Sequence, residues 1–228
     1  MLLLSLDTST TVCSVALHSD GGLLGCYELF TERTSSSMLT TLIGNVVQQT
    51  GFALNDLDGV AVAKGPGSYT GLRIGVSTAK GLCFALDRPL LSVNTLRAMT
   101  EQVRQFFLPT LFCPMIDARR MEVYCALYDQ TGAEVKPTAA EIIDENSFGE
   151  WLADHQIVFF GDGADKCRAV LEKHPNALFL AELIRPSART IGELATDKFR
   201  TGQFENLAAF EPFYLKEFMT TKPRKAVV

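Results

Sequence analysis

An internal repeat restricts the fold of this chain more than any other feature of its sequence. When Asp117 is aligned with Asp7, the apolar strands that follow them coincide, and Gly132 falls on Gly22 at the same offset. In both halves an apolar strand ends in an aspartate, after which come a short polar turn, a second strand and a hairpin. The alternative is a chance similarity between two strand–helix segments. A duplicated unit is favoured because the matching features occur in the same order in both halves. We therefore expect two structural domains of one architecture.

A glycine turn between a strand and a helix is the second landmark of the repeat. Residues 59–86 contain an apolar strand, the turn Gly65-Pro66-Gly67-Ser68 and an amphipathic segment, and residues 157–164 repeat the strand and a Gly-x-Gly turn. Such a turn can present backbone N–H groups to an anion, or it can simply connect a strand to a helix. Together with the hydrophobic pattern elsewhere, it predicts the order β-β-β-α-β-α-β-α for the first half.

An α/β chain with duplicated β-β-β-α-β-α units has the layout of the actin/Hsp70/sugar-kinase superfamily, also called ASKHA or ribonuclease H-like. The expected halves are residues 1–108, with the glycine turn, and residues 109–228, with the tail. In that superfamily, hairpins and glycine turns hold ATP, because amides bind phosphates and carboxylates bind Mg²⁺ or act as a base. The corresponding positions here are Asp7, Thr8, Ser9, Gly65, Gly67, Ser68, Asp117 and Gly161. A turn or capping role explains these residue types equally well.

Composition and charge exclude several classes of protein. The net charge of −5 argues against holding nucleic acid through the overall field of the protein. No apolar run reaches about 18 residues, and no basic region precedes the first strand, which predicts a cytoplasmic protein without membrane contact. The six cysteines include no C-x-x-C pair and the three histidines have no ligand spacing. We therefore expect reduced, buried cysteines and no metal site.

Several segments together resemble the TsaB family, also called YeaZ, of bacterial tRNA threonylcarbamoyladenosine biosynthesis proteins. The main ones are Asp7–Ser9, Gly65–Gly75, Ala79–Leu82, Ile116–Arg119 and Glu211–Lys216. The run GPGSYTGLRIG is the most specific of them. The resemblance extends from the first strand to the tail, although it is loose over the middle of the second half.

The resemblance implies a non-catalytic subunit required for threonylcarbamoylation of the adenosine next to the anticodon in tRNAs that read ANN codons. TsaB proteins pair with the metal-bearing transferase TsaD, the ATPase TsaE joins them, and TsaB alone is expected to form a homodimer. No catalytic residue and no bound cofactor are therefore expected on this chain, with ATP or ADP and metal on the partner subunits and tRNA bound through the complex. The sequence departs from the family at Thr34–Ser37, where many members have a histidine, and at Lys64, where many have arginine.

The resemblance also places the TsaD interface on the first two helices. Glycine within a helix costs about 0.5–1 kcal/mol relative to alanine, yet Gly71, Gly75 and Ala79 form a flat stripe at helical spacing. The stripe can receive a partner helix, the chain's own first helix or the sheet. The first helix has apolar residues on more than one side, which favours a partner. The predicted interface residues are Met38, Leu39, Leu42, Ile43, Val46, Gly71, Leu72, Gly75 and Ala79.

Two other functions stay open from the sequence, a small ATP-dependent kinase with Asp117 as its base and a glycoprotease-like peptidase. Against the kinase, the chain lacks the large insert with which a sugar kinase closes over its sugar. Against the peptidase, the sequence has no H-E-x-x-H pattern and no histidine placed beside a nucleophile. The sequence does not exclude a catalytic triad assembled in space.

Overall fold

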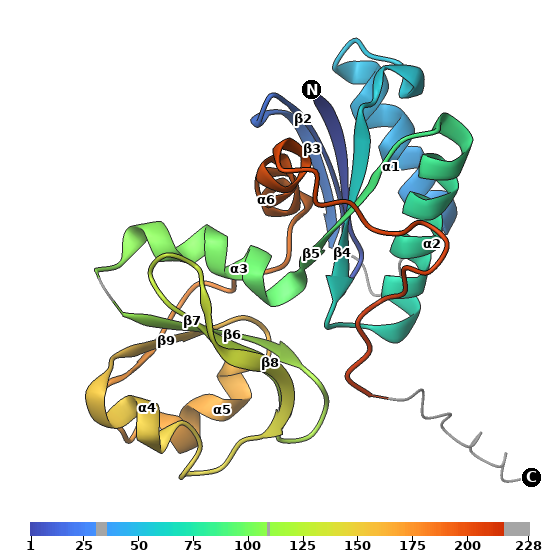
Figure 1. Ribbon diagram of the computed structural model, residues 1–228. Coiled ribbons are helices and arrows are strands. Elements are labelled where there is room, and N and C mark those ends of the chain that lie inside the picture. Colours follow the sequence, from blue (N-terminus) through green and yellow to red (C-terminus); the bar gives the residue numbers. More distant parts are fainter. Residues whose placement is uncertain (31–35, 109, 217–228) are drawn as a thin grey trace, which may run out of the picture.

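The computed structural model describes residues 1–30, 36–108 and 110–216, which form two five-stranded sheets flanked by helices (Figure 1). The N-terminal half contains β1 (Leu2–Asp7), β2 (Val12–Ser19), β3 (Gly22–Phe30), α1 (Ser36–Gln49), β4 (Gly59–Gly65), α2 (Tyr69–Leu86), β5 (Leu90–Asn94) and α3 (Thr95–Val103). The C-terminal half contains β6 (Leu111–Asp117), β7 (Glu122–Tyr128), β8 (Glu134–Ile142), α4 (Gly149–Asp154), β9 (Ile157–Phe160), α5 (Ala164–Leu171), β10 (Ala177–Phe179) and α6 (Ala188–Arg200). Short 3₁₀ turns lie at Leu54–Asp56 and Arg104–Phe106.

The two sheets share one strand order, which confirms the internal repeat. The first sheet has the order β3-β2-β1-β4-β5, and the second has the order β8-β7-β6-β9-β10. In each half the first three strands pair antiparallel, and the last two add as parallel strands through crossover helices. Each half therefore follows the order β-β-β-α-β-α-β-α, and the fold is the predicted α/β fold of the ASKHA, ribonuclease H-like superfamily.

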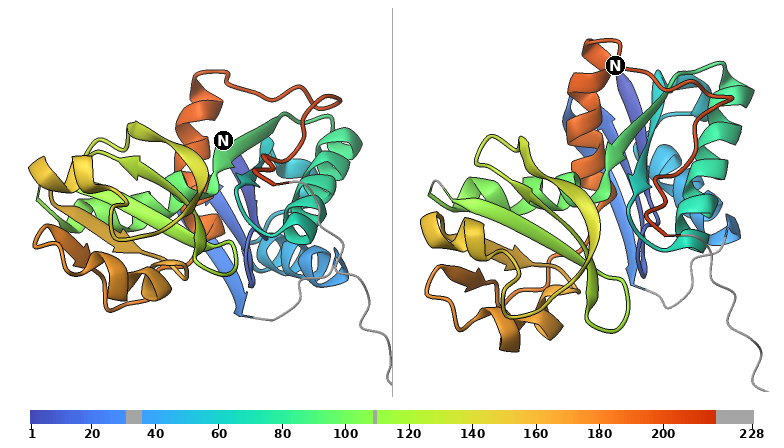
Figure 2. Two further views of the ribbon diagram at one scale, coloured as in Figure 1. Left: turned by 90° about the horizontal axis from the view of Figure 1, so that it is seen from below. Right: turned by 60° about the horizontal axis from the view of Figure 1, so that its bottom comes forward.

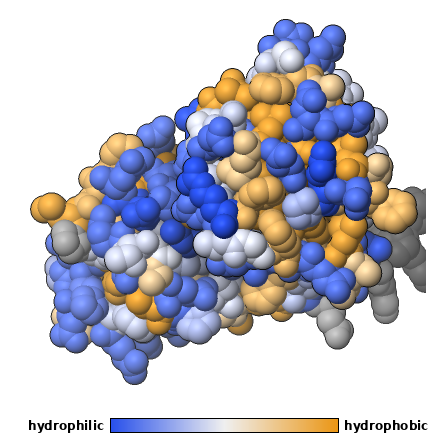
Figure 3. All heavy atoms as spheres, turned by 45° about the horizontal axis from the view of Figure 1, so that its top comes forward, coloured by the Kyte–Doolittle hydropathy of each residue, from blue (hydrophilic) through white to orange (hydrophobic). Residues whose placement is uncertain are grey.

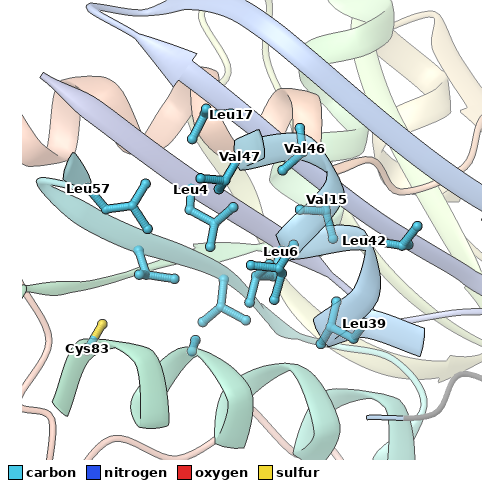
Figure 4. Close-up of a cluster of buried hydrophobic side chains, with 14 of the residues drawn as sticks. Leu4, Leu6, Val15, Leu17, Leu39, Leu42, Val46, Val47, Leu57 and Cys83 are labelled. Atoms are coloured by element: carbon cyan, nitrogen blue, oxygen red, sulfur yellow. The ribbon is translucent and has the colours of Figure 1, made fainter. Parts of the chain in front are cut away.

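The strands of the first sheet direct alternate side chains into two cores. Leu4 and Leu6 of β1 pack with α1 and α2 on one face of the sheet (Figure 4), whereas Leu3 packs with α6 on the other face. A sheet that is covered on both faces needs apolar side chains in both directions. This requirement explains why β1 and β4 are almost uninterrupted apolar runs in the sequence.

The last helix of each half packs on the sheet of the other half. Leu96 and Met99 of α3 enter the core of the second sheet, and Ile191 and Ala195 of α6 pack on the first sheet. The two helices also contact each other, and Figure 2 shows them between the sheets. After α6, residues 205–213 run past β5 and α2 of the N-terminal half (Figure 1), and Lys216 then contacts the turn between β6 and β7.

Local sequence signals explain where several helices begin and end. Ser68 and Asn94 are residue types that predict N-caps, and they accept hydrogen bonds from first-turn amides of α2 and α3. Gly51 has a φ of +83° and follows the end of α1, where the backbone needs the left-handed conformation. These residues therefore account for three helix ends.

One predicted helix is shorter than expected. The sequence pattern of residues 144–154 predicts a helix with Trp151 on its apolar face, but α4 forms only in the second half of this range. Asp144 instead stabilises a turn, because its carboxylate accepts a 2.9 Å hydrogen bond from the Asn146 N–H. Phe148 then has a φ of +63°, which a right-handed helix excludes.

The six cysteines form no disulfide bond, and five of them are buried. None of the helices in the described ranges has the length and apolar character that crossing a bilayer requires. The basic tail segment at residues 220–228 lies outside the described residues, and so do Thr34 and Ser35 of the segment that departs from the family.

Candidate functional site

Asp7 ends β1 and stabilises the turn that leads into β2. Its Oδ1 atom accepts hydrogen bonds from the Ser9 backbone N–H (2.9 Å) and the Ser9 hydroxyl (2.6 Å). Its Oδ2 atom is buried and has no hydrogen-bond partner within the described residues. Burial raises the pKa of Asp7 to about 6, although the two bonds from Ser9 lower it. This carboxylate therefore serves as the acceptor of an Asx turn.

The glycine turn and the start of α2 pack directly on this β1–β2 turn. The Ser68 N–H donates to the Ser9 carbonyl oxygen (2.6 Å), and the Thr8 hydroxyl donates to the Gly71 carbonyl oxygen (2.7 Å). A Cβ atom at Gly67 would lie only 2.2 Å from the Ser9 carbonyl oxygen, so this approach requires glycine. The structure thus brings the two predicted turns together, but they contact each other directly and leave no space for a phosphate between them.

Gly65 accommodates a different neighbour. It has a φ of +111°, and a Cβ atom at this position would lie 2.8 Å from the carbonyl oxygen of Phe213. The Phe213 N–H donates a 2.7 Å hydrogen bond to the Lys64 carbonyl oxygen. The glycine turn therefore contacts the C-terminal segment of the chain where a phosphate-binding loop would face its ligand.

Asp117 ends β6 in the corresponding turn of the C-terminal half. Its carboxylate accepts hydrogen bonds from the Lys166 ammonium (2.5 Å) and the Arg119 N–H (2.7 Å), and the Asp162 carboxylate accepts the Asp117 N–H (2.9 Å). Partial burial raises the pKa of Asp117. The hydrogen bonds and charges of Lys166 and Arg119 lower it by more, so the pKa lies below its ordinary value. A carboxylate with a lowered pKa is a weak general base, which disfavours a kinase mechanism with Asp117 in that role.

Gly161 belongs to this second cluster and also has a packing role. It has a φ of +101°, and a Cβ atom there would lie 2.3 Å from the Met115 carbonyl oxygen. Within the described residues no hydrogen bond joins the N-terminal cluster to this one. The backbone amides of Ser9, Ser68 and Arg119 all donate within the chain. A phosphate group would have to displace these bonds, so the geometry supports turn and packing roles for the predicted nucleotide-site residues.

Ser5 and His18 lie together beneath α6, which bears on the peptidase alternative. A Cβ atom at Gly192 would lie 2.2 Å from His18 Nδ1 and 2.7 Å from Ser5 Oγ. Both side chains are 0% exposed, so no substrate reaches this serine–histidine pair. Burial also lowers the pKa of His18. In the part of the chain that the structure describes, no three His, Cys, Asp or Glu side chains are placed to hold a metal ion.

The side chains predicted for the partner interface lie in the core of the N-terminal half. The buried ones are Leu39, Leu42, Ile43, Val46, Leu72 and Ala79. Figure 4 shows Leu39, Leu42 and Val46 among side chains of β1 and β2, and Met38 packs against the same core. The prediction is corrected because α1 contacts both the sheet and α2. A helix with two neighbours inside its own domain needs apolar residues on two sides.

The small-residue stripe of α2 also faces inward. A Cβ atom at Gly71 would lie 2.0 Å from the Thr8 carbonyl oxygen, and one at Gly75 would lie 2.4 Å from the Thr8 hydroxyl oxygen. The stripe therefore accommodates the β1–β2 turn, so the close approach of the sheet explains these glycines. The interpretation that the stripe receives a partner helix is corrected on this ground.

The outer faces of α1 and α2 form a surface that the sequence analysis missed. Gly44 of α1 and Gly81 of α2 are exposed, and a Cβ atom at either position would meet nothing within 4 Å. Phe84, one turn beyond Gly81, is 82% exposed. Figure 3 shows hydrophobic surface gathered over the N-terminal half, whereas the C-terminal half is mostly hydrophilic on this face. Glycines inside helices but off the apolar stripe were the sequence signal for this surface.

Comparisons with known proteins agree with this architecture. Residues 25–218 match the family model of TsaD, the tRNA N6-adenosine threonylcarbamoyltransferase. The tRNA threonylcarbamoyladenosine biosynthesis protein TsaB of Escherichia coli K12 is 29% identical over an alignment 232 positions long, which covers 97% of each chain. TsaB of Bacillus subtilis 168 is 30% identical over 75% of this chain and 76% of its own length. The solved structure of YeaZ from Pseudomonas aeruginosa superposes with a TM-score of 0.80 at 30% identity, covering 94% of this chain and 99% of that one.

Proposed function

This chain belongs to the TsaB family, and we propose that it is a non-catalytic subunit of the machinery that makes threonylcarbamoyladenosine in tRNA. It pairs with a TsaD transferase and recruits TsaE, and the complex modifies the adenosine next to the anticodon of tRNAs that read ANN codons. It works in the cytoplasm, where it meets tRNA. The family names of its relatives and the match to the TsaD family support this assignment.

The two hairpin turns support the non-catalytic part of the proposal. Asp7 is 1% exposed and holds Ser9, while Asp117 is paired with Lys166. Both carboxylates serve the turns that contain them, and the nearby amides donate within the chain. Nucleotide and metal chemistry therefore reside on the partner subunits in this proposal.

The open space above Gly44 and Gly81 is the observation that carries the pairing part of the proposal. Each glycine sits inside a helix at a cost of about 0.5–1 kcal/mol relative to alanine, and neither contacts any part of the described chain through its Cβ position. Glycine on a helix surface lets a second helix approach closely. Because TsaD matches this chain over residues 25–218, it offers corresponding helices for a bundle across the interface. A second copy of this chain takes that place when the protein is alone.

Leucine substitutions test this interface without disturbing the core. Gly81→Leu and Gly44→Leu place a bulky side chain into open space, so the monomer is expected to keep its circular dichroism spectrum and to have a thermal midpoint at least as high as that of the wild type. The larger side chain holds the partner helix away, and both TsaD binding and self-association in size-exclusion chromatography are expected to be lost. Gly81→Ala is the matched control, since it adds only a methyl group. If folded leucine variants still bind TsaD, the outer faces of α1 and α2 are not the interface.

A further inference from the structure

The tip of the β6–β7 hairpin carries two arginines in a conformation that disfavours them. Arg119 and Arg120 have φ values of +74° and +52°, and both side chains are exposed. Left-handed backbone is adopted readily by glycine and tolerated by asparagine, but other side chains resist it. Two consecutive arginines at such positions make the turn less stable than Gly or Asn would. The loss of stability suggests that the two exposed arginine side chains serve a binding function at this turn.

The C-terminal segment, residues 205–216, connects this hairpin to the start of α2. Lys80 donates from its ammonium group to the carbonyl oxygens of Ala208 (3.2 Å) and Phe210 (3.0 Å), which fixes the segment on α2. Further along, the ring of Tyr214 lies 4.7 Å from the ring of Tyr69. The segment therefore carries an aromatic pair from the glycine turn towards the C-terminal half.

Lys216 completes the connection between the two halves. Its ammonium group forms an ion pair with Glu122, contacts the Ala118 carbonyl oxygen at 3.4 Å and lies 5.7 Å from the centre of the Tyr124 ring. On the α2 side, the Arg73 guanidinium lies 5.5 Å from the centre of the Tyr69 ring. Basic and aromatic side chains thus alternate over one continuous surface, which we call the hairpin–tail surface. It consists of Tyr69, Arg73, Arg119, Arg120, Tyr124, Tyr214 and Lys216.

The charge of this surface is opposite to that of the protein. The chain has a net charge of −5, yet two nearby carboxylates are neutralised, Asp117 by Lys166 and Glu122 by Lys216. Within the described residues neither Arg119 nor Arg120 forms an ion pair. Two exposed carboxylates, Glu211 on the C-terminal segment and Asp162, which accepts the Asp117 N–H, reduce the excess by two charges.

We propose that the hairpin–tail surface binds the phosphate backbone of RNA. Arginine side chains on a projecting turn neutralise phosphates, and the half-buried tyrosines beside them add aromatic surface against which unpaired bases can stack. An acidic segment of a partner protein is the alternative ligand, but it would require only the cationic side chains and not the tyrosines that lie between them. The inference rests on the proposed function, according to which the RNA that this surface contacts is tRNA.

A paired substitution tests the proposal while keeping the turn. Arg119→Asn with Arg120→Asn removes both charges and leaves residues that tolerate positive φ. Arg88→Asn with Lys173→Asn is the matched control, because it removes two exposed cations from other loops. The full chain, alone and mixed with TsaD, is titrated with a fluorescent tRNA transcript at several salt concentrations. Binding by the Arg119/Arg120 variant is expected to weaken roughly tenfold near 0.1 M salt, and the slope of log affinity against log salt is expected to fall by about two.

Capture of TsaD, measured on the same samples, separates this inference from the proposed function. Normal capture together with weakened tRNA binding supports RNA as the ligand. Equal tRNA binding by the variant and its control overturns the inference, and so does a wild-type protein without tRNA affinity in either form. Loss of TsaD capture with unchanged tRNA binding also overturns it, because the surface would then bind an acidic protein. A complex that binds tRNA through the hairpin but leaves the adenosine unmodified contradicts only the proposed function.

Discussion

The Thr8 hydroxyl donates a 2.7 Å hydrogen bond to the carbonyl oxygen of Gly71 and so joins the turn after β1 to the first turn of α2. The carbonyl oxygen of Thr8 lies on the same side, 2.0 Å from where a Cβ atom of Gly71 would be. The chain's own atoms therefore occupy the space between its first hairpin and its glycine turn. This contact explains why the most specific sequence motif of the chain stabilises its fold.

Gly71→Ala is expected to lower the free energy of unfolding by about 1–3 kcal/mol, because the added methyl group overpacks against backbone atoms of the β1–β2 turn. Gly81→Ala is the control, since its methyl group enters open space. That variant is expected to raise the free energy of unfolding by about 0.5–1 kcal/mol through helix propensity alone. Urea unfolding followed by circular dichroism measures both. Equal effects of the two substitutions would show that Gly71 has no packing role.

Asp7 is expected to make stability depend on pH in the acidic range. Burial raises its pKa to about 6 in the folded protein, from 3.8 in the unfolded chain. The folded state therefore keeps this proton longer, so the stabilising effect is complete below pH 3.8 and is lost as the pH rises through 6. Asp7→Asn removes the titrating group and keeps an acceptor for Ser9. It is expected to be more stable than the wild type above pH 6, by up to about 3 kcal/mol, and equally stable or less stable near pH 4.

The difference in urea unfolding free energy between the wild type and Asp7→Asn, measured at several pH values, tests this expectation. Taking the difference cancels other titrating groups, including His18, whose lowered pKa acts in the opposite direction. A difference that does not change between pH 4 and pH 7 would show that Asp7 has an ordinary pKa in the folded protein.

Much of the fold could be predicted from the sequence, because hydrophobic period and turn residues act locally. The repeat, the order of strands and helices along the chain and the caps at Ser68 and Asn94 all follow from such signals. The exchange of α3 and α6 between the halves could not be predicted, since periodicity shows that a helix has an apolar side but not which sheet covers it.

The site was harder to predict for the same reason. Leu42 looked available to a partner, but it is 6% exposed because α1 is covered by both the sheet and α2. A charge at Leu42 would therefore unfold the monomer and would not test pairing. Exposed glycines such as Gly81 identify the outer surface only once the helix has been oriented by its neighbours.

Asp117→Asn is expected to leave threonylcarbamoylation by the complex largely unchanged. Asp117 accepts from Lys166 and the Arg119 N–H in a surface turn, and an amide oxygen can still accept both bonds. Because the ion pair is partly exposed, its loss is expected to cost at most about 1 kcal/mol of stability. Modified nucleoside in tRNA, quantified by mass spectrometry after reconstitution, is the measurement. Complete loss of modification by a variant that folds and binds TsaD would give Asp117 a role in catalysis.

This chain is proposed to be a required subunit without catalytic activity of its own. The most direct test is mass spectrometry of threonylcarbamoyladenosine in a tRNA that reads an ANN codon, incubated with threonylcarbamoyl donor and TsaE. TsaD alone, this chain alone and the two together are compared. We expect modification only when TsaD and this chain are both present, and none from this chain alone. Transfer by this chain alone, or equal transfer by TsaD without it, would contradict the account.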